Sequence, residues 1–176
     1  MNLNRYVRST LLASTVCAVA ALPTLAAEPT PAAAAAGEAA APSAYVKPKI
    51  THGPYGALKF VIPLTTDDKA IQAQKLRNIA NGLKAADEWQ GRFTFKIVLY
   101  AKGVTLLKSP DEATAQKLDM LRSRGVQIEV CGNTLAEQNI DFHSLYHVTE
   151  ADIVPSGFAE VAYLQAKEHY VVDPVN

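Results

Sequence analysis

Five short apolar segments alternate with helical patterns in residues 49–176, and this alternation constrains the fold more than any other feature of the sequence. Between the first two segments, Leu76, Ile79 and Leu83 recur at the spacing of residues on one face of a helix. Strand–helix alternation predicts a mostly parallel sheet covered by helices on both faces. We therefore expect an α/β fold, a three-layer α/β/α sandwich of about five strands, with strands at 58–64, 93–100, 126–130, 152–155 and 170–172.

The third of these segments differs from the others because its residues alternate in polarity. Gln127 and Glu129 lie between branched apolar residues, so one face of this strand is predicted to be less buried than the other. Such a pattern suits a strand at the edge of the sheet or in contact with another subunit.

The amino-terminal residues have the pattern of a signal peptide followed by a spacer. Arg5 and Arg8 precede an apolar run at 11–22, and small residues before Ala26 suit cleavage there. The run is short for a membrane span. Residues 27–48 are rich in alanine and proline and read as a disordered spacer. We expect residues 1–26 to be removed on export, residues 49–176 to form one domain, and the mature protein to be periplasmic or secreted without membrane attachment.

Charge and glycine content exclude several classes of function. The chain has 17 basic and 17 acidic residues, and losing Arg5 and Arg8 with the signal peptide leaves 15 against 17, a net charge of −2. This balance gives no footprint for nucleic acid. The sequence has no glycine-rich phosphate-binding motif of the Walker or dinucleotide type, so we expect no cofactor.

Cys131 is the residue most suggestive of chemistry. The other cysteine, Cys17, lies within the expected signal peptide, so Cys131 is predicted to be the one thiol of the mature chain. It follows the strand at 126–130 and precedes a helix that Thr134 and Glu137 start in a capping-box pattern. The positive end of a helix and its free N–H groups favour a nucleophilic thiolate. The alternative is a small buried residue with a structural role only.

In a parallel sheet, ligands bind outside the carboxyl ends of the strands. The residues predicted to gather there with Cys131, and thus to bind a ligand, are Lys102, Gly103, Gly132, Asn133, Ser156 and Gly157. Simpler explanations are a solvated loop lysine for Lys102 and helix caps for Asn133 and Ser156. His143 and His147 are four residues apart, a spacing that would allow a metal site with Cys131, but no HExxH motif is present and no metal site is assigned.

The same segments resemble the DsrE/DsrF-like family of small sulfur-relay proteins over roughly residues 59–174. The similarity is carried by YAKGVTLL at 100–107, VCGNTL at 130–135, VPSG at 154–157 and EVAYLQ at 160–165. The resemblance implies an α/β/α sandwich that assembles into homo-oligomers. Relatives carry sulfur as a persulfide on a cysteine and pass it to a partner protein, and Cys131 matches that cysteine.

Three hypotheses for function follow. The first is an exported, single-cysteine sulfur-handling protein in which Cys131 accepts and donates sulfane sulfur, with a sulfur donor or acceptor protein as its partner. The second is a non-catalytic oligomeric binding or accessory module with the same fold. The third and weaker one is a metal-binding protein.

Overall fold

The computed structural model describes residues 49–173, and the elements below are those of this part of the chain. The predicted signal peptide at 1–26 and the spacer at 27–48 lie outside the described residues. None of the described helices is long and apolar enough to cross a membrane.

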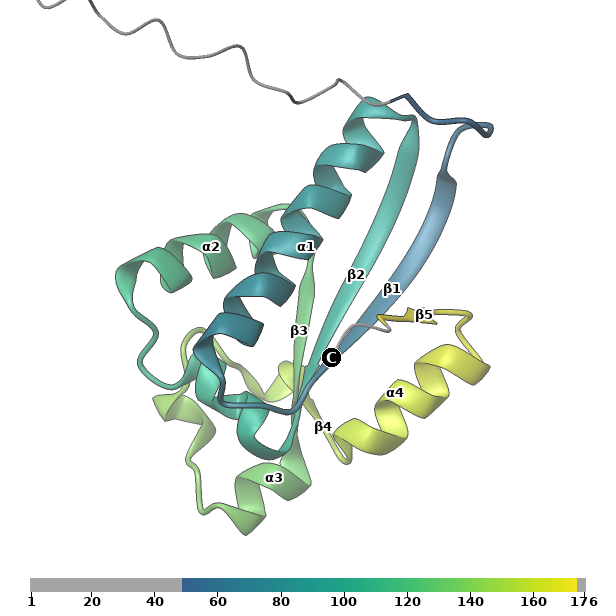
Figure 1. Ribbon diagram of the computed structural model, residues 1–176. Coiled ribbons are helices and arrows are strands. Elements are labelled where there is room, and N and C mark those ends of the chain that lie inside the picture. Colours follow the sequence, from purple (N-terminus) through teal and green to yellow (C-terminus); the bar gives the residue numbers. More distant parts are fainter. Residues whose placement is uncertain (1–48, 174–176) are drawn as a thin grey trace, which may run out of the picture. The chain divides into compact units, whose positions relative to one another are not determined.

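The centre of the fold is a five-stranded sheet in which every pairing is parallel (Figure 1). The strand order is β4-β3-β2-β1-β5, so the two longest strands lie side by side in the middle. The prediction of an α/β fold with a largely parallel sheet is confirmed. The strands are β1 (Gly56–Leu64), β2 (Gly91–Leu99), β3 (Gln127–Cys131), β4 (Ile153–Val154) and β5 (Val171–Val172).

Helices cover both faces of the sheet, as a set of parallel crossovers requires. Figure 1 shows α1 (Lys69–Glu88) and α2 (Glu112–Ser123) on one side, and α4 (Gly157–Ala166) on the other. The short α3 (Gly132–Glu137) lies beyond the carboxyl end of β3. Three short 3₁₀ helices complete the connections: η1 (Ala101–Leu107), η2 (Phe142–Ser144) and η3 (Glu150–Asp152).

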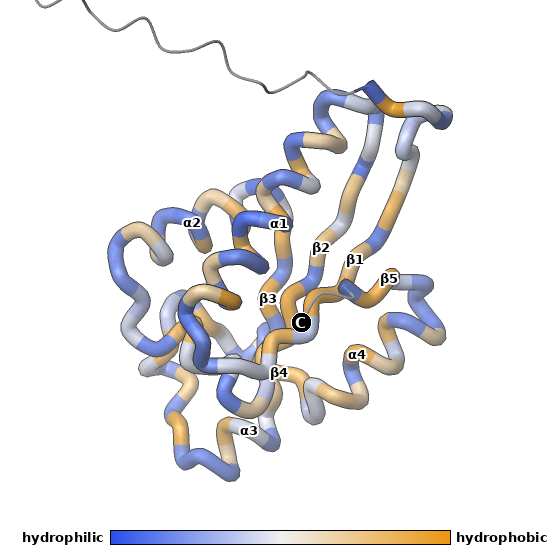
Figure 2. The backbone as a smooth tube through the Cα atoms, viewed as in Figure 1, coloured by the Kyte–Doolittle hydropathy of each residue, from blue (hydrophilic) through white to orange (hydrophobic). Residues whose placement is uncertain are grey.

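The first helix shows why these residues fold where they do. Asp68 caps α1 by accepting the N–H groups of Ala70 at 2.8 Å and Ile71 at 3.2 Å. The apolar stripe of α1 then faces the sheet, and Figure 2 shows it as orange segments between blue ones along the helix. Leu76 and Ile79 are buried in this stripe, each contributing about 1.5–3 kcal/mol relative to exposure.

Side chains of successive strand residues point to opposite faces, and this alternation assigns Cys131 to one helix layer. Val130 belongs to the large apolar cluster on the α1–α2 side, whereas Val61 and Val98 form a smaller cluster with Leu164 of α4. Cys131 follows Val130, so its side chain lies on the α4 side of the sheet.

The polar residues Gln127 and Glu129 are less buried than their apolar neighbours in β3, as predicted, but they do not mark an edge of the sheet. β3 is not the outermost strand, because β4 pairs with it at Val130 and Cys131. Glu129 also lies on the α4 side, and its carboxylate forms an ion pair with Lys96 of β2. The polarity of Glu129 thus reflects a charged pair on the α4 side of the sheet, where only 12% of its side chain is exposed.

Candidate functional site

The turns after β1 and β2 pack directly on each other at the carboxyl edge of the sheet. A Cβ atom on Gly103 would lie 1.8 Å from the carbonyl oxygen of Leu64, so no larger residue fits between η1 and the end of β1. Gly103 is buried, and its place in the fold is this close approach of two backbones. It was predicted as a ligand-binding residue, and the structure gives it a packing role.

Cys131 is both the last residue of β3 and the N-cap of α3. Its Sγ accepts the backbone N–H of Thr134 at 3.5 Å, so the sulfur takes the place that a serine or aspartate oxygen usually takes at a cap. The helix begins close to the predicted position, with α3 extending from Gly132 to Glu137, but its N-cap is Cys131 and not Thr134 as the capping-box pattern indicated. The thiol is therefore closer to the helix than the capping-box pattern indicated.

Thr134 is buried, with 4% of its surface exposed, and it joins this cap to the turn after β2. Its Oγ1 accepts the N–H of Ala101 at 2.9 Å, which leaves the hydroxyl hydrogen available to the sulfur of Cys131. Gln138 holds the other side of the same residue by donating from Nε2 to the Ala101 carbonyl oxygen at 2.9 Å. Ala101 has φ = 50°, a strained conformation for a non-glycine residue, and both contacts hold it there.

The amino terminus of α4 reaches the same sulfur from the other side. Ser156 is the N-cap of α4, as predicted, and its side chain accepts the N–H of Ala159 at 3.4 Å. The next residue, Gly157, is buried and directs its backbone N–H toward the sulfur of Cys131. A Cβ atom on Gly157 would lie 3.0 Å from Tyr100 and 3.2 Å from the Cβ of Cys131. Glycine thus allows the helix end to approach the thiol closely.

These donors decide the ionisation of the thiol. Burial of Cys131 raises its pKa, because the charged form loses solvation. Hydrogen bonds from the backbone N–H groups of Gly157, Thr134 and Asn133, and from the Thr134 hydroxyl, act in the opposite direction and prevail. The pKa of the thiol is therefore lower than its ordinary value, although Cys131 is only 5% exposed.

The structure assigns the remaining predicted residues to different surroundings. Lys102 is exposed and forms an ion pair with Asp67 at 3.5 Å, with no contact to the thiol among the described residues. The side chain of Asn133 is exposed, and only its backbone faces the sulfur. Gly132 lies against β4. A Cβ atom added to Gly132 would be 3.3 Å from the carbonyl oxygen of Val154.

The two histidines do not form a metal site in the described part of the chain. His143 pairs with Asp141 at 2.7 Å on the surface, and His147 lies 4.0 Å from Asp119. Residues 49–173 contain no group of three histidine, cysteine or acidic residues placed to hold a metal ion. The metal-binding hypothesis therefore has no site among these residues.

Two contributors to the site, Thr134 and Ala101, were not identified from the sequence. Thr134 was interpreted as a helix cap, and Ala101 has no polar side chain to attract notice. Their contacts join residues 33 positions apart. The motif at 130–135 was the only available signal, and it did not show which of its residues are buried.

Comparison with known proteins agrees with this architecture. The family model described as the DsrE/DsrF-like family matches residues 59–174. A solved structure of a protein of unknown function from Methanobacterium thermoautotrophicum is similar with a TM-score of 0.54 and 22% identity, over 67% of this chain and 97% of that chain. A conserved protein of unknown function from Bacteroides thetaiotaomicron gives a TM-score of 0.47 and 20% identity, over 65% and 91%.

Among curated proteins, no sequence matches this chain. The likeness to the methanobacterial structure shows a shared fold. The family model extends from within β1 to just beyond β5 and includes the segment around Cys131. The chain therefore belongs to the DsrE/DsrF-like family.

Proposed function

We propose that this protein is an exported sulfur-handling protein in which Cys131 accepts and donates sulfane sulfur as a persulfide. Membership of the family supports a function of the sulfur-relay type. The observation that carries the proposal is the convergence of donors on one sulfur atom. Backbone N–H groups from the ends of two helices and the Thr134 hydroxyl all reach Cys131 at the carboxyl edge of the sheet.

These donors suit a thiolate that attacks sulfur and is later released. The Cys131 thiolate attacks the terminal sulfur of a polysulfide chain, forming one S–S bond while the shortened polysulfide leaves with the electron pair of the bond that breaks. An acceptor thiolate then attacks the outer sulfur of the persulfide and takes it, and Cys131 leaves as a thiolate. No external oxidant is needed. The same hydrogen bonds stabilise the negative charge before the first step and after the second.

The test is the mass of the protein after treatment with polysulfide, in a Cys17→Ser background so that Cys131 is the one thiol observed. We expect the native protein to gain about 32 Da for each added sulfur, and to lose it again with a reductant, as a low-pKa thiol does. Cys131→Ser should gain nothing. A thiol that gains sulfur only after denaturant is added would overturn the proposal.

Export is part of the proposal and has a separate test. It is supported by the basic start, the apolar run and the small residues before Ala26. Sequencing of the amino terminus of protein recovered from outside the cytoplasm should begin near Ala27. Retention of the full chain in the cytoplasm would refute export without affecting the thiol chemistry.

The second candidate function, an oligomeric binding or accessory module, is favoured by the outer face of α4. Phe158 is 75% exposed and Tyr163 is 52% exposed, although the inner face of the same helix packs on the sheet. A helix that is apolar on both faces is usually covered on both. Light scattering should give a multiple of the subunit mass, and Phe158→Ser should reduce it more than the control Gln165→Ser on the same helix.

Mass and persulfide formation together separate the two functions. An oligomer whose native thiol remains inert to polysulfide would leave the binding module as the function. A monomer at micromolar concentration would contradict self-association.

A further inference from the structure

The outer edge of β1 is unpaired along its amino-terminal half. β2 pairs with β1 over its whole length, whereas β5 pairs only with Phe60 and Val61. The Val61 carbonyl accepts the N–H of Asp173 at 2.9 Å, so the backbone groups of Val61 point outward. Because this direction alternates along a strand, Lys59 and Ala57 also point their N–H and C=O groups outward. The parallel pairing of Phe60 with Val171 uses the Lys59 carbonyl. The outward groups without a strand partner in the described part of the chain are therefore the N–H of Lys59 and both backbone groups of Ala57, and an open edge of this kind is a template for another strand.

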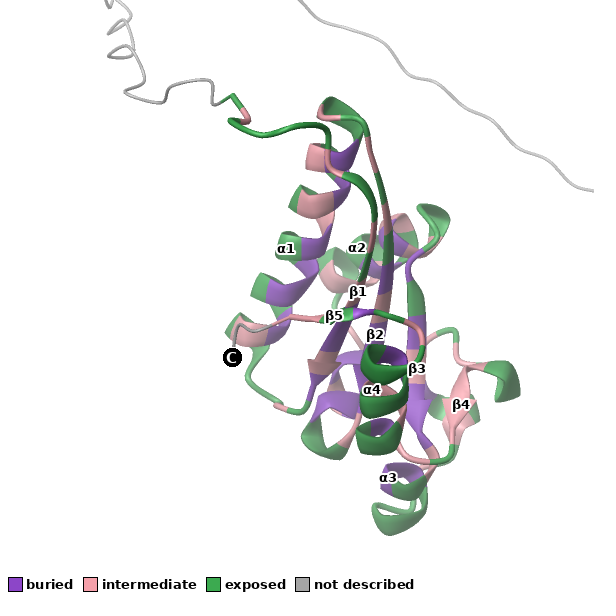
Figure 3. Cartoon of the chain, turned by 90° about the vertical axis from the view of Figure 1, so that its right-hand side faces the viewer, coloured by how far each residue is buried: buried purple, intermediate pink, exposed green. Residues whose placement is uncertain are grey.

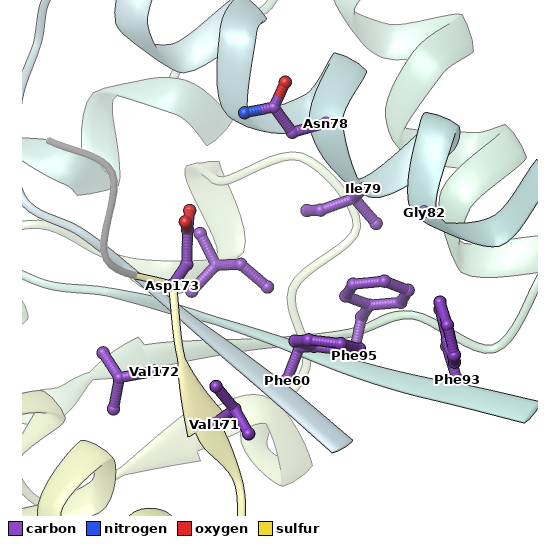
Figure 4. Close-up of a pocket in the computed structure, with 10 residues that line it drawn as sticks. Phe60, Asn78, Ile79, Gly82, Phe93, Phe95, Val171, Val172 and Asp173 are labelled. Carbon is purple, nitrogen blue, oxygen red and sulfur yellow. The ribbon is translucent and has the colours of Figure 1, made fainter. Parts of the chain in front are cut away.

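An aromatic pocket lies beside this edge, on the α1 side of the sheet. Figure 4 shows the rings of Phe60, Phe93 and Phe95 gathered below α1, with Val171 of β5 at one side. Phe60 and Phe95 stack with ring centres 5.1 Å apart, and Phe93 meets Phe60 edge-on at 5.3 Å. Gly82 of α1 makes room for these rings, since a Cβ atom there would lie 2.9 Å from Phe95.

The size of this pocket suits one side chain. Its volume is about 230 Å³ and most of its lining is apolar. An apolar cavity of about 150 Å³ accepts benzene, whereas drug-sized ligands occupy sites of roughly 300–1,000 Å³. The pocket can therefore hold one aromatic or leucine-sized group, and its lining includes Phe60, the β1 residue next to the unpaired half, and the 53% exposed Val171.

The opposite side of the same edge carries one exposed arginine beside a lysine–glutamate ion pair. α4 does not cover this half of β1, which is coloured mainly as exposed in Figure 3. A second pocket there includes Ala57 and Arg92. Lys59 is drawn aside by an ion pair with Glu168 at 3.6 Å. Arg92 is exposed and makes no ion pair or hydrogen bond with any other described residue, so it is the cation that remains available on this side.

We propose that the free edge of β1 binds an extended segment of a partner protein as an added strand. Both backbone groups of Ala57 and the N–H of Lys59 provide the backbone hydrogen bonds, as in other cases of strand addition. Because side chains alternate along the added strand, one large apolar side chain enters the aromatic pocket and its two neighbours face the Arg92 side. Charge complementarity makes those neighbours acidic, so the preferred sequence is acidic–apolar–acidic.

The chain's own amino-terminal residues do not have this sequence. Residues 1–48 contain two acidic residues, Glu28 and Glu38, and each is flanked only by alanine, glycine or proline. The charge and the pocket therefore favour a segment from another protein over a segment of this one.

The test uses a fluorescent heptapeptide with blocked ends and the central sequence Asp-Phe-Glu, titrated with the full chain and followed by polarisation. The decisive variant is Ala57→Pro, which removes one outward N–H that the fold does not use. Proline is tolerated at an outward edge position, and β1 already carries Pro63 in the same outward set. Ala57→Ser keeps the N–H and is the matched control.

We expect the wild type and Ala57→Ser to bind alike, and Ala57→Pro to bind at least about tenfold more weakly because it loses one strand hydrogen bond and its register. Arg92→Ala should weaken binding about threefold, as expected for an exposed ion pair. Arg92→Glu should reverse the preference toward a Lys-Phe-Lys peptide. Circular dichroism and thermal unfolding must show that each variant is folded.

Several outcomes would overturn this proposal. Absence of binding to the wild type, or equal binding by a folded Ala57→Pro, would remove strand addition. A lower particle mass for Ala57→Pro in light scattering would show that the edge joins copies of this chain instead. Binding that appears only after residues 1–48 are deleted would identify the chain's own leader as the occupant.

Discussion

Replacing Thr134 by valine tests how the structure controls the thiol. The substitution keeps the shape of the side chain and removes the hydroxyl that donates to the Cys131 sulfur and accepts from Ala101. A hydrogen bond to a charged group contributes about 1.5–3 kcal/mol. We use the lower value because the neighbouring N–H reaches the sulfur only at 3.5 Å. About 1.4 kcal/mol is a factor of ten in the ratio of thiolate to thiol.

The expected effect on reactivity changes sign with pH. Below the pKa of both proteins, Thr134→Val has about tenfold less thiolate, but the more basic thiolate is about threefold more nucleophilic for a Brønsted coefficient of 0.4–0.5. The variant should therefore react about threefold more slowly at acidic pH. Above both pKa values each thiol is fully ionised, and the variant should react about threefold faster.

The assay is the rate of exchange with a small aromatic disulfide, measured from mildly acidic to strongly alkaline pH in a Cys17→Ser background. Thr134→Ser is the matched control, because it keeps the hydroxyl and loses only a methyl group at a cost of about 0.8 kcal/mol in stability. Its rate profile should follow the wild type. A valine variant whose rate falls by the same factor at every pH would refute the hydrogen-bond explanation, and so would a serine variant that behaves like valine.

Three further predictions concern stability, each measured by urea unfolding. The pKa of Cys131 is lower in the folded protein, so its ionisation stabilises the fold above the unfolded pKa near 9.0, and this stabilisation is lost as pH falls through the folded pKa. The stability of the wild type relative to Cys131→Ser should therefore rise with pH between the two pKa values. A difference in stability that stays constant with pH would contradict this prediction. Asp173→Ala removes the carboxylate that lies 2.7 Å from the buried ammonium of Lys75 and should lower the free energy of unfolding by about 3 kcal/mol. Lys75→Met should lower it clearly less, because it leaves no buried charge. Equal losses of stability in the two variants would argue against this account. Gly103→Ala places a Cβ atom 1.8 Å from a backbone oxygen of β1 and should lower the free energy of unfolding by more than about 3 kcal/mol or prevent folding. The control Gly132→Ala, whose nearest contact would be at 3.3 Å, should fold. A stable Gly103→Ala would show that the turns after β1 and β2 separate easily.

Much of the fold follows from local patterns. The apolar run of β1 and the three- and four-residue spacing in α1 locate these elements within a few residues of their bounds. The cap of α4 at Ser156 was also predictable, since its hydroxyl acts on an N–H only three residues away. Short β4 and β5 were located as well, but their pairing partners were not, because pairing depends on which strands the crossovers bring together.

The site was only partly predictable. The end of a strand placed Cys131 at the carboxyl edge of the sheet, and the structure confirms that position. The capping-box pattern at Thr134 was misleading, because its hydroxyl serves Ala101 rather than its own helix. Lys102 and Gly103 share the same edge but are used for an ion pair and for close packing. The sequence showed which residues at this edge are polar or small. Contacts with residues distant in the sequence decided whether each of them binds, packs or forms an ion pair.

The sequence alone determined the parallel α/β architecture, the position of one thiol after a strand, and the glycines around it. Periodicity and turn chemistry act between residues a few positions apart, so they can be read along the chain. The tertiary structure alone decided the state of that thiol. Gly157 and Thr134 come to the Cys131 sulfur from different helices, and Ala101 is fixed through Thr134 from a third element. Burial and hydrogen bonding depend on distances in space, and only the packing of α3 and α4 on the sheet sets those distances.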